Sequence, residues 1–379
     1  MNKSVHKYSV LMVGAMPPQL GGIERYVGDL IASELGLHHR VIPFNLNKPL
    51  VNSKTSFKTL AGYQRSFGRG ILTVLTSYAY SAFFFIKFLL FLLTKWIDII
   101  HIHSASYTSF WEKCYYIYVG KLFGKKIVLH IHGSRFESFY EQSGGRARRW
   151  IAYFMQKCDT VIALGQYWRR FYCRFLPMEK VKVVYNGIDL QSYTSQTPKT
   201  DDPSLVFVGE VGQRKGIYDL LASLKRLQRD WPGIRLDIIG TGELDQVAQK
   251  SQIMGLKHVH LHGARFAQHK VDILCRSWCF VLPSYAEQMP LVIIEAFAAG
   301  LPVISTRIGT IPEMIDPFEN GFVVNAGDVV QLAKMISLVL ENETLRMEMG
   351  RKNRLKALSL YDINRCAQDI DTIYQSLKI

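Results

Sequence analysis

Short runs of apolar, β-branched residues alternate along the whole chain with longer stretches of helical periodicity. This alternation is typical of parallel β-sheets whose strands are joined by crossover helices. We predict a set of strands in each half of the chain. Those of the first half lie near residues 9–13, 97–103, 127–132, 160–163 and 181–184, and those of the second half near 205–208, 236–239, 259–261, 280–282 and 303–305.

A polar, turn-rich segment without an apolar period, residues 186–203, separates the two sets of strands and is the predicted linker. The length of 379 residues also favours two domains over one. The predicted fold class is α/β, with two doubly wound, Rossmann-like domains, 1–185 and 204–360, that face each other across a cleft. We expect a C-terminal helix over 361–379 to pack back on the first domain. Ligands of such folds bind at the carboxyl ends of the strands.

Residues 70–93 form an apolar segment in which Lys87 is the one charged residue among 24, so the segment is long enough to span a bilayer. A span would place the strand-like runs before and after it on opposite sides of the membrane, which disagrees with a single sheet. Two interpretations remain. The segment is either a helix that covers the sheet and offers apolar surface to the lipid interface, or a simple buried helix.

The positive charge is concentrated in the first half of the chain. Residues 1–185 hold 25 Lys and Arg against 9 Asp and Glu, a net charge of +16, whereas the whole chain carries +15. This asymmetry suggests nucleic acid, an anionic membrane or a phosphorylated ligand as a partner, and a solvated basic face without a partner is the alternative. The chain has no helix-turn-helix, RNP or basic-helix signature, which argues against nucleic acid.

The six cysteines include no CxxC pair of the kind that binds metals, and the first residues do not have the pattern of a signal peptide. We therefore expect reduced thiols and a cytosolic compartment.

Two loops at predicted strand ends have residues suited to phosphate. Gly21 and Gly22 precede a helix that begins near Ile23, and glycines there let backbone amides approach an anion. Arg214 and Lys215 precede a helix that begins near residue 216. Cations beside a helix N-terminus are unfavourable to its dipole unless an anion joins them. The alternative is a flexible surface pair of basic residues.

Two HIH triplets place His101, His103, His130 and His132 in predicted strands. Residues two apart share one face of a strand, so a zinc site has to be considered. No third type of ligand is arranged nearby in the sequence. We therefore favour the hypothesis that His132, at the mouth of its strand, hydrogen-bonds a polar substrate.

Two carboxylates stand in the apolar stretch "YAEQMPLVIIEAFAAGLPV", residues 285–303. Glu287 falls in the loop after a strand, Pro290 suits the first turn of the next helix, and Glu295 falls inside that helix near its second turn. The two carboxylates are thus not one acid/base pair. A helix N-terminus that binds an anion, with carboxylates on either side that accept sugar hydroxyls, suits a nucleotide-sugar.

These residues resemble those of retaining glycosyltransferases of family 4, which have the GT-B fold. The resemblance covers nearly the whole chain and is most specific in "LPSYAEQMPLVIIEAFAAGLPVISTRIGTIPEMI". Supporting segments are "GG" at 21–22, "HIHG" at 130–133, "YNGID" at 185–189 and "RKG" at 214–216.

The resemblance implies a role for each matching residue. Glu287 and His132 would contact the transferred sugar, Lys215 the diphosphate and Glu295 the ribose, so that Glu287, His132 and Lys215 are the expected catalytic residues. It implies no bound metal and no cofactor besides the nucleotide-sugar substrate, UDP- or GDP-linked. The remaining expected donor-binding residues are Gly21, Gly22, Arg214, Met289, Pro290 and Leu291.

Two residues depart from the family pattern. Glu210 stands where an Arg commonly follows the Gly of "FVG", and Gln288 stands where Gly is usual after the first Glu of the motif. A carboxylate near a diphosphate repels it unless the side chain turns away or pairs with a cation. A catalytically inactive homologue that acts as a binding or scaffold subunit is therefore the alternative to an active enzyme.

The resemblance extends to enzymes of bacterial capsule, exopolysaccharide and O-antigen synthesis. It implies a lipid-linked or oligosaccharide acceptor. A pyrophosphate headgroup at an anionic membrane surface also suits the basic first half. We expect a cytoplasmic protein that is peripheral on the inner face of the cytoplasmic membrane.

Overall fold

The computed structural model describes residues 8–17, 21–47, 71–193, 199–264 and 268–378, with the side chains of the helix at 71–94 described from residue 80 onward. The chain divides into two compact units. The N-terminal unit consists of Met1–Tyr185 and Asn364–Ile379, and the C-terminal unit consists of Asn186–Ile363.

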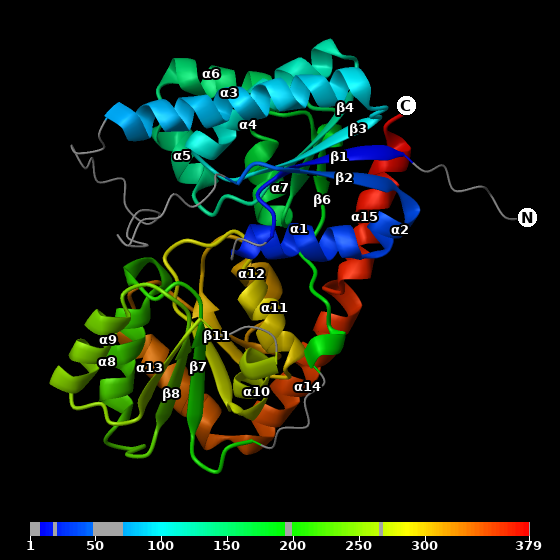
Figure 1. Cartoon of the computed structure of the whole chain (residues 1–379). Coiled ribbons are helices and arrows are strands. Elements are labelled where there is room, and N and C mark those ends of the chain that lie inside the picture. The colour runs from blue at the N-terminus through cyan, green and yellow to red at the C-terminus, as the bar shows by residue number, and fades with distance from the viewer. Residues whose placement is uncertain (1–7, 18–20, 48–70, 194–198, 265–267, 379) are drawn as a thin grey trace, which may run out of the picture. The chain divides into compact units, whose positions relative to one another are not determined.

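The N-terminal unit is built on a parallel six-stranded sheet with the order β2-β1-β3-β4-β5-β6 (Figure 1). Its central strands are buried along their length because helices cover both faces, which is why they read as continuous apolar runs. The strands are β1 Ser9–Gly14, β2 Arg40–Asn45, β3 Ile99–Ser104, β4 Lys126–Ile131, β5 Thr160–Ala163 and β6 Val181–Val183.

The two faces of this sheet differ in polarity. Ile100 and Ile127 face helix α4, whose Gly120 leaves room for their side chains. Helices α1 and α15 lie on the opposite face, where β3 and β4 carry histidines (Figure 1). The helices are α1 Gly22–Ala32, α2 Glu34–His38, α3 Ile71–Thr94, α4 Thr108–Leu122, α5 Phe136–Gln142, α6 Gly145–Lys157, α7 Gln166–Tyr172 and α15 Ile363–Ser376, with a 3-10 turn at Met178–Lys180.

Helix α3 corresponds to the apolar segment and packs on its own unit. Its buried side chains recur every fourth residue, at Phe84, Phe88 and Leu92, and Phe88 lies with its ring centre 4.9 Å from that of Tyr116 on α4. The opposite side of the helix exposes large apolar side chains. Within the described residues, no helix is both long and apolar enough to cross a membrane. Exposed apolar residues of α3 are Phe83, Ile86, Leu90 and Leu93.

The C-terminal unit repeats the architecture with a second parallel sheet, in the order β12-β11-β10-β7-β8-β9. Helices α8, α9 and α13 lie on one face, and α10, α11 and α14 on the other (Figure 1). Its strands are β7 Ser204–Val208, β8 Arg235–Ile239, β9 Val259–Gly263, β10 Cys279–Leu282, β11 Val303–Thr306 and β12 Gly321–Val324. Its helices are α8 Ile217–Leu227, α9 Leu244–Ile253, α10 Gln268–Arg276, α11 Leu291–Ala298, α12 Ile311–Met314, α13 Val329–Glu341 and α14 Glu343–Leu360, with 3-10 turns at Gln191–Tyr193 and Gln213–Lys215.

The two parallel sheets confirm the predicted doubly wound fold class. Every predicted strand is present, with ends shifted by at most two residues. The strands β2 and β12 were not predicted, and each forms one edge of its sheet.

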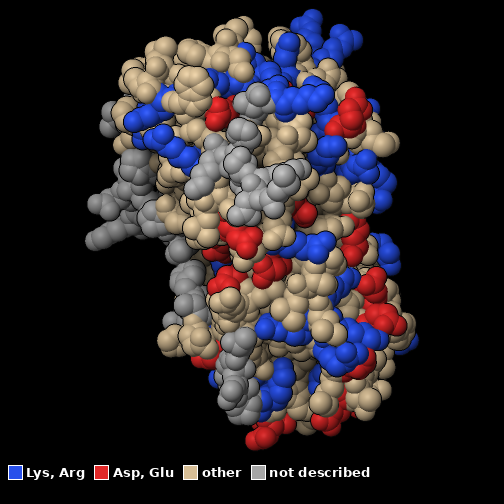
Figure 2. Space-filling view, turned by 90° about the vertical axis from the view of Figure 1, so that its right-hand side faces the viewer, with Lys and Arg blue, Asp and Glu red and all other residues tan. Residues whose placement is uncertain are grey.

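Basic side chains predominate on the N-terminal unit, as its sequence requires. Figure 2 shows one face, on which Lys and Arg gather over that unit in the upper part of the view and mix with acidic side chains over the C-terminal unit.

Candidate functional site

The chain order of the C-terminal sheet reverses between β7 and β10. These two strands are neighbours, yet β8 and β9 extend the sheet on one side of them and β11 and β12 on the other. The loops that follow β7 and β10 therefore start side by side at the carboxyl edge of the sheet. Such a switch point is where ligands bind in open α/β sheets.

The two loops touch through backbone atoms. Gly216 follows the first loop with φ +71°, and a Cβ at this position would lie 1.9 Å from the carbonyl oxygen of Pro283. Only glycine fits this approach without displacing the neighbouring loop. The amide of Tyr285 donates a hydrogen bond of 2.9 Å to the carbonyl of Arg214, which fixes the spacing of the loops.

Lys215 and Glu287 meet across this junction. The Lys215 Nζ lies 2.5 Å from Glu287 Oε1, and the hydroxyl of Ser284 donates a 2.7 Å hydrogen bond to the same oxygen. The side chain of Lys215 is 12% exposed and that of Glu287 is 6% exposed. Both side chains are therefore largely buried at the junction. The two groups neutralise each other because each would otherwise be a costly buried charge.

The departure at Glu210 has a local partner. Its carboxylate lies 2.5 Å from the guanidinium of Arg214, one turn further along the chain, and both side chains are partly exposed. Arg214 also donates a 3.4 Å hydrogen bond to the carbonyl oxygen of Ala286. Of the two possibilities for Glu210, pairing with a cation is the one observed, so its charge is compensated on the β7 side of the junction.

Helix α11 follows the β10 loop and begins at Leu291. Pro290 lies one residue before the helix with φ −73°, at its N-cap rather than inside the first turn. The preceding residue is held from outside the loop, because the side-chain amide of Asn186 donates a 3.0 Å hydrogen bond to the carbonyl oxygen of Met289. The segment of Met289, Pro290 and Leu291 is therefore fixed at the start of α11.

A third loop, after β11, supports the same region. The amide of Thr310 donates a 3.0 Å hydrogen bond to the carbonyl oxygen of Gln288. Gly309 has φ +54°, and a Cβ there would lie 2.4 Å from the carbonyl oxygen of Glu287. Gln288 itself is buried. The G-x-I-P-E part of the sequence motif thus braces the loop that carries Glu287.

Glu295 lies in the second turn of α11, as predicted, and is 1% exposed. Its carboxylate lies 2.6 Å from the ammonium group of Lys270 on α10. Lys270 was not singled out in the sequence, because it belongs to none of the recognised motifs. The contact brings a lysine into the core of the unit to face the second carboxylate of the motif.

The other predicted site residues belong to the N-terminal unit. Gly21 is the N-cap of α1 and Gly22 its first residue, one residue earlier than predicted, while residues 18–20 lie outside the described part. His132 follows the end of β4, and its Nε2 lies 2.9 Å from Nδ1 of His103. Burial lowers the pKa of His132 to about 3, so its imidazole is neutral near pH 7.

Family models match both parts of the chain. The model described as "Glycosyltransferase Family 4" matches residues 20–192, and the model described as "Glycosyl transferases group 1" matches residues 191–356. The chain is a member of the GT-B glycosyltransferases. This confirms the family expected from the motifs. The residues matched by the model "Glycosyl transferases group 1" include both Lys215 and Glu287.

Relatives of this GT-B chain include two bacterial proteins. It is 30% identical to glycogen synthase of Mycobacterium tuberculosis over 209 residues. The aligned region covers 53% of this chain and 50% of that protein. It is 23% identical to the capsular polysaccharide biosynthesis glycosyltransferase CapM of Staphylococcus aureus over 201 residues. The aligned region covers 50% of this chain and 53% of that protein. The chain thus spans about half the length of these relatives.

A solved structure shares the fold over the whole chain. HepE of Anabaena, crystallised with UDP-glucose, matches with a TM-score of 0.74 at 18% identity, over 97% of this chain and 99% of that one. At this identity the likeness supports the GT-B fold and no finer statement.

Proposed function

We propose that this protein transfers a sugar from a nucleotide-sugar donor to a saccharide acceptor, with retention of anomeric configuration. The observation that carries the proposal is the buried pair of Lys215 and Glu287 at the switch point of the C-terminal sheet. A cation and a carboxylate placed together there match the two parts of a nucleotide-sugar, the diphosphate and the sugar hydroxyls.

The pair suggests how the donor is received. The diphosphate attracts Lys215 more strongly than one carboxylate does, because it carries two charges. When Lys215 turns to the diphosphate, the Glu287 carboxylate is released to accept hydrogen bonds from sugar hydroxyls. As the glycosidic bond breaks, negative charge grows on the leaving nucleoside diphosphate, and Lys215 stabilises it. Donor binding thus gives Lys215 a diphosphate partner and gives the Glu287 carboxylate sugar hydroxyls in place of the lysine.

Other residues contribute to donor binding in this proposal. Glu295 accepts the ribose hydroxyls, and backbone amides around Met289–Leu291 bind phosphate or sugar oxygens. Gly21 and Gly22, at the start of α1, let backbone amides approach the donor, and neutral His132 hydrogen-bonds its sugar. The compensation of Glu210 by Arg214 supports an active enzyme over an inactive scaffold subunit, because it removes the repulsion expected for the diphosphate.

The donor in this proposal is UDP- or GDP-linked. Lys215 supplies the positive charge at the diphosphate, so we propose that transfer needs no divalent metal and no cofactor.

We further propose a lipid-linked acceptor in cell-surface polysaccharide synthesis, at the inner face of the cytoplasmic membrane. The capsular role named for CapM supports the pathway class. Helix α4 packs against both α3 and α6, and all three helices expose large apolar side chains amid the basic charge of this unit. Such a surface suits an anionic lipid interface. We call it the three-helix surface: Phe83, Ile86, Leu90, Leu93, Tyr115, Tyr118, Leu122, Trp150 and Tyr153.

The experiment that tests the transferase combines a donor screen with three variants. Purified protein is offered UDP- and GDP-sugars, and binding is measured by calorimetry and turnover by nucleotide release. Glu287→Gln and Lys215→Met should each lower turnover roughly a hundredfold or more, because each removes an electrostatic group from the proposed donor site. Lys257→Met is the control, since Lys257 is an exposed lysine of the same unit.

Each outcome decides between the alternatives. Retention is read from the anomeric signals of the product by NMR, and an inverted product refutes it. Wild-type protein that binds no nucleotide-sugar supports the scaffold alternative. Normal turnover in both variants refutes the site assignment.

A further inference from the structure

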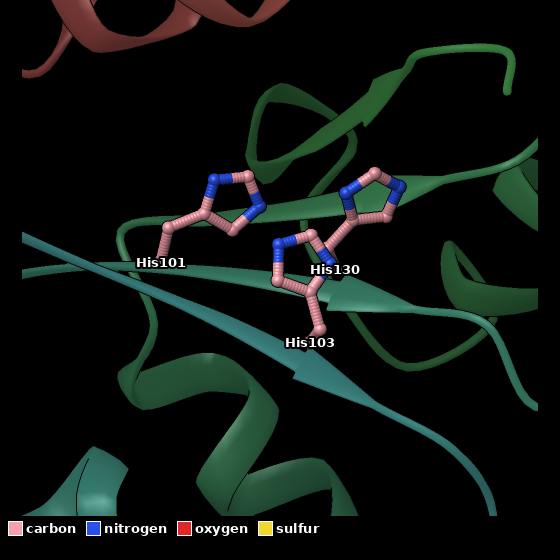
Figure 3. Close-up of side chains that lie close together, drawn as sticks. All are labelled: His101, His103 and His130. Carbon is pink, nitrogen blue, oxygen red and sulfur yellow. The ribbon is translucent and has the colours of Figure 1, made fainter. Parts of the chain in front are cut away.

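Four histidines cluster on one face of the N-terminal sheet, away from the Lys215–Glu287 junction in the sequence and outside the C-terminal unit. His101 and His103 lie on β3, and His130 on β4 is the direct register partner of His103. Figure 3 shows these three side chains, which project from neighbouring strands to the same side of the sheet. One ring nitrogen from each lies within 4.8 Å of the others. His132 adjoins the cluster through its contact with His103.

The three imidazoles are buried, and several of their nitrogens lack hydrogen-bond partners. Neither ring nitrogen of His130 has a partner among the described residues, and Nε2 of His101 has none either. A buried polar atom without a partner destabilises the folded state. Three such atoms in one cluster lower the stability of the core, whereas apolar side chains would fill the same space without leaving polar atoms unpartnered. Their convergence therefore points to a species that binds lone pairs there.

The hydrogen bonding of His101 suits metal binding. Nδ1 of His101 lies 2.6 Å from the hydroxyl of Tyr374 on α15. When Nδ1 donates to this oxygen, Nε2 is left as an acceptor, which is the arrangement of metal-binding histidines.

The atoms around the cluster indicate which metals fit. The thioether sulfur of Met12 lies 2.9 Å from Nε2 of His103, and the cluster of ligand atoms contains no carboxylate. Calcium and magnesium require oxygen ligands and do not suit this set. Imidazole and thioether are ligands of zinc and of monovalent copper.

We propose that His101, His103 and His130 form a binding site for a soft d10 metal ion, Zn²⁺ or Cu⁺, in the core of the N-terminal unit. Ligand nitrogens about 2.0–2.1 Å from the metal lie roughly 3.4 Å apart, which is closer than the 4.8 Å limit observed. A bound ion therefore ties β3 to β4 through its ligands. The ion is structural, and its ligands include neither Lys215 nor Glu287, so metal affinity and donor turnover are measured as separate properties.

The test uses the full chain without a histidine tag. Metal is removed, and Zn²⁺ or anaerobic Cu⁺ is then offered to the folded protein and, separately, during refolding, so that slow entry into the core does not hide a site. Affinity is measured against a chromophoric chelator of each ion, and thermal melting is recorded with and without metal. We expect one equivalent of Zn²⁺ or Cu⁺ to bind and to raise the melting temperature by several degrees, and Mg²⁺ to have no effect.

Two variants with the same substitution separate the site from other histidines. His130→Phe keeps a ring of similar size and removes both unpartnered nitrogens, whereas His258→Phe changes an exposed histidine of the C-terminal unit. His130→Phe should weaken metal binding roughly a hundredfold or more, by analogy with the loss of supporting groups around metal sites. His258→Phe should bind as the wild type does.

Contrary results overturn the proposal. If the site holds only water, the wild type binds no stoichiometric metal under either condition and His130→Phe melts at a higher temperature than the wild type. Equal metal affinity in His130→Phe and the wild type is equally decisive against it. Should His130→Phe fail to fold, X-ray absorption of the metal-loaded wild type decides, since fewer than three nitrogen ligands contradict the assignment.

Discussion

Replacement of Lys270 by methionine should destabilise the C-terminal unit strongly. Lys270 Nζ lies 2.6 Å from Glu295 Oε1, and the two side chains are 11% and 2% exposed. The methionine side chain has a similar length and no charge, so the Glu295 carboxylate would lose a cation that lies in direct contact with it inside the core. Breaking a buried pair in this way costs about 3–5 kcal/mol. For a unit of this size that corresponds to a fall in melting temperature of roughly 6–20 °C.

Removal of both charges should have a different effect. In Lys270→Met/Glu295→Leu no charge is left buried, and well-packed apolar replacements of buried pairs are neutral or stabilising. The double variant should therefore melt near the wild-type temperature. It should nevertheless have lost donor affinity, because Glu295 is the proposed ligand of the ribose. Stability and donor binding are thus separated in one set of proteins.

Calorimetric melting and hydrogen exchange of the α11 peptide measure the first effect, and nucleotide titration measures the second. Lys257→Met is again the matched control. If Lys270→Met melts at the wild-type temperature and its hydrogen exchange in α11 is unchanged, Lys270 does not compensate a buried charge on Glu295. A double variant that binds the donor normally refutes the role of Glu295.

Three further predictions concern the donor site and the membrane, and a fourth concerns the thiols. Glu210→Arg should keep or raise nucleotide affinity and change stability by less than about 1 kcal/mol, because the ion pair of Glu210 with Arg214 is partly exposed. A loss of nucleotide binding in calorimetry contradicts this. Gly216→Ala should abolish nucleotide binding and lower the melting temperature, since its Cβ would lie 1.9 Å from the Pro283 carbonyl oxygen; wild-type binding rejects the need for glycine. Flotation with anionic vesicles should exceed flotation with neutral ones and should fall with salt, and equal flotation on both argues against a charge-driven contact. In native protein at pH 8, a thiol reagent should label half-buried Cys173 first and should label the buried thiols only after unfolding. The reason is that burial raises the pKa of Cys114 to about 12 and also raises the pKa values of Cys158 and Cys279. Prompt labelling of these three cysteines contradicts the prediction.

The predicted edge strands β6 and β9 are partly exposed, and the other strands that the sequence predicted are almost wholly buried, with helices on both faces of the sheet. Such strands need apolar, β-branched residues at every position, so their pattern is visible without knowledge of their neighbours. The two strands that escaped prediction lie at sheet edges. β2 contains Pro43 and exposed residues, and β12 begins with Gly321, which weakens a strand pattern, so neither stands out from a loop.

The site was predictable in part for a similar reason. Glu287, Glu295 and Lys215 stand in motifs whose spacing is local, and their placement on loops and helix was correct. The pairing of Lys215 with Glu287, however, joins residues 72 positions apart, and that of Lys270 with Glu295 joins residues on different helices. Only the order of strands in the sheet brings these residues together, and a single sequence does not encode that order in any local pattern.

The histidines show the same limit. The HIH triplets predicted that pairs share a face of a strand, but not that His103 and His130 are register partners. The sequence alone does not show this register, so it did not predict that the ring nitrogens of His101, His103 and His130 lie close together. A substrate-binding role for His132 was therefore the simpler interpretation.

The assignment of α15 to the N-terminal unit has a consequence for how the chain is made. The sheet of this unit is synthesised by residue 185, but three of the contacts that cover it involve residues after 363. At about 5–20 residues per second, a ribosome needs roughly 10–35 s to make the intervening segment. During that interval α15 does not yet cover the histidine face. A chaperone or a metal ion can therefore reach histidines that are buried in the finished protein. The late contacts are Tyr26 with Cys366, His39 with Asp371 and His101 with Tyr374.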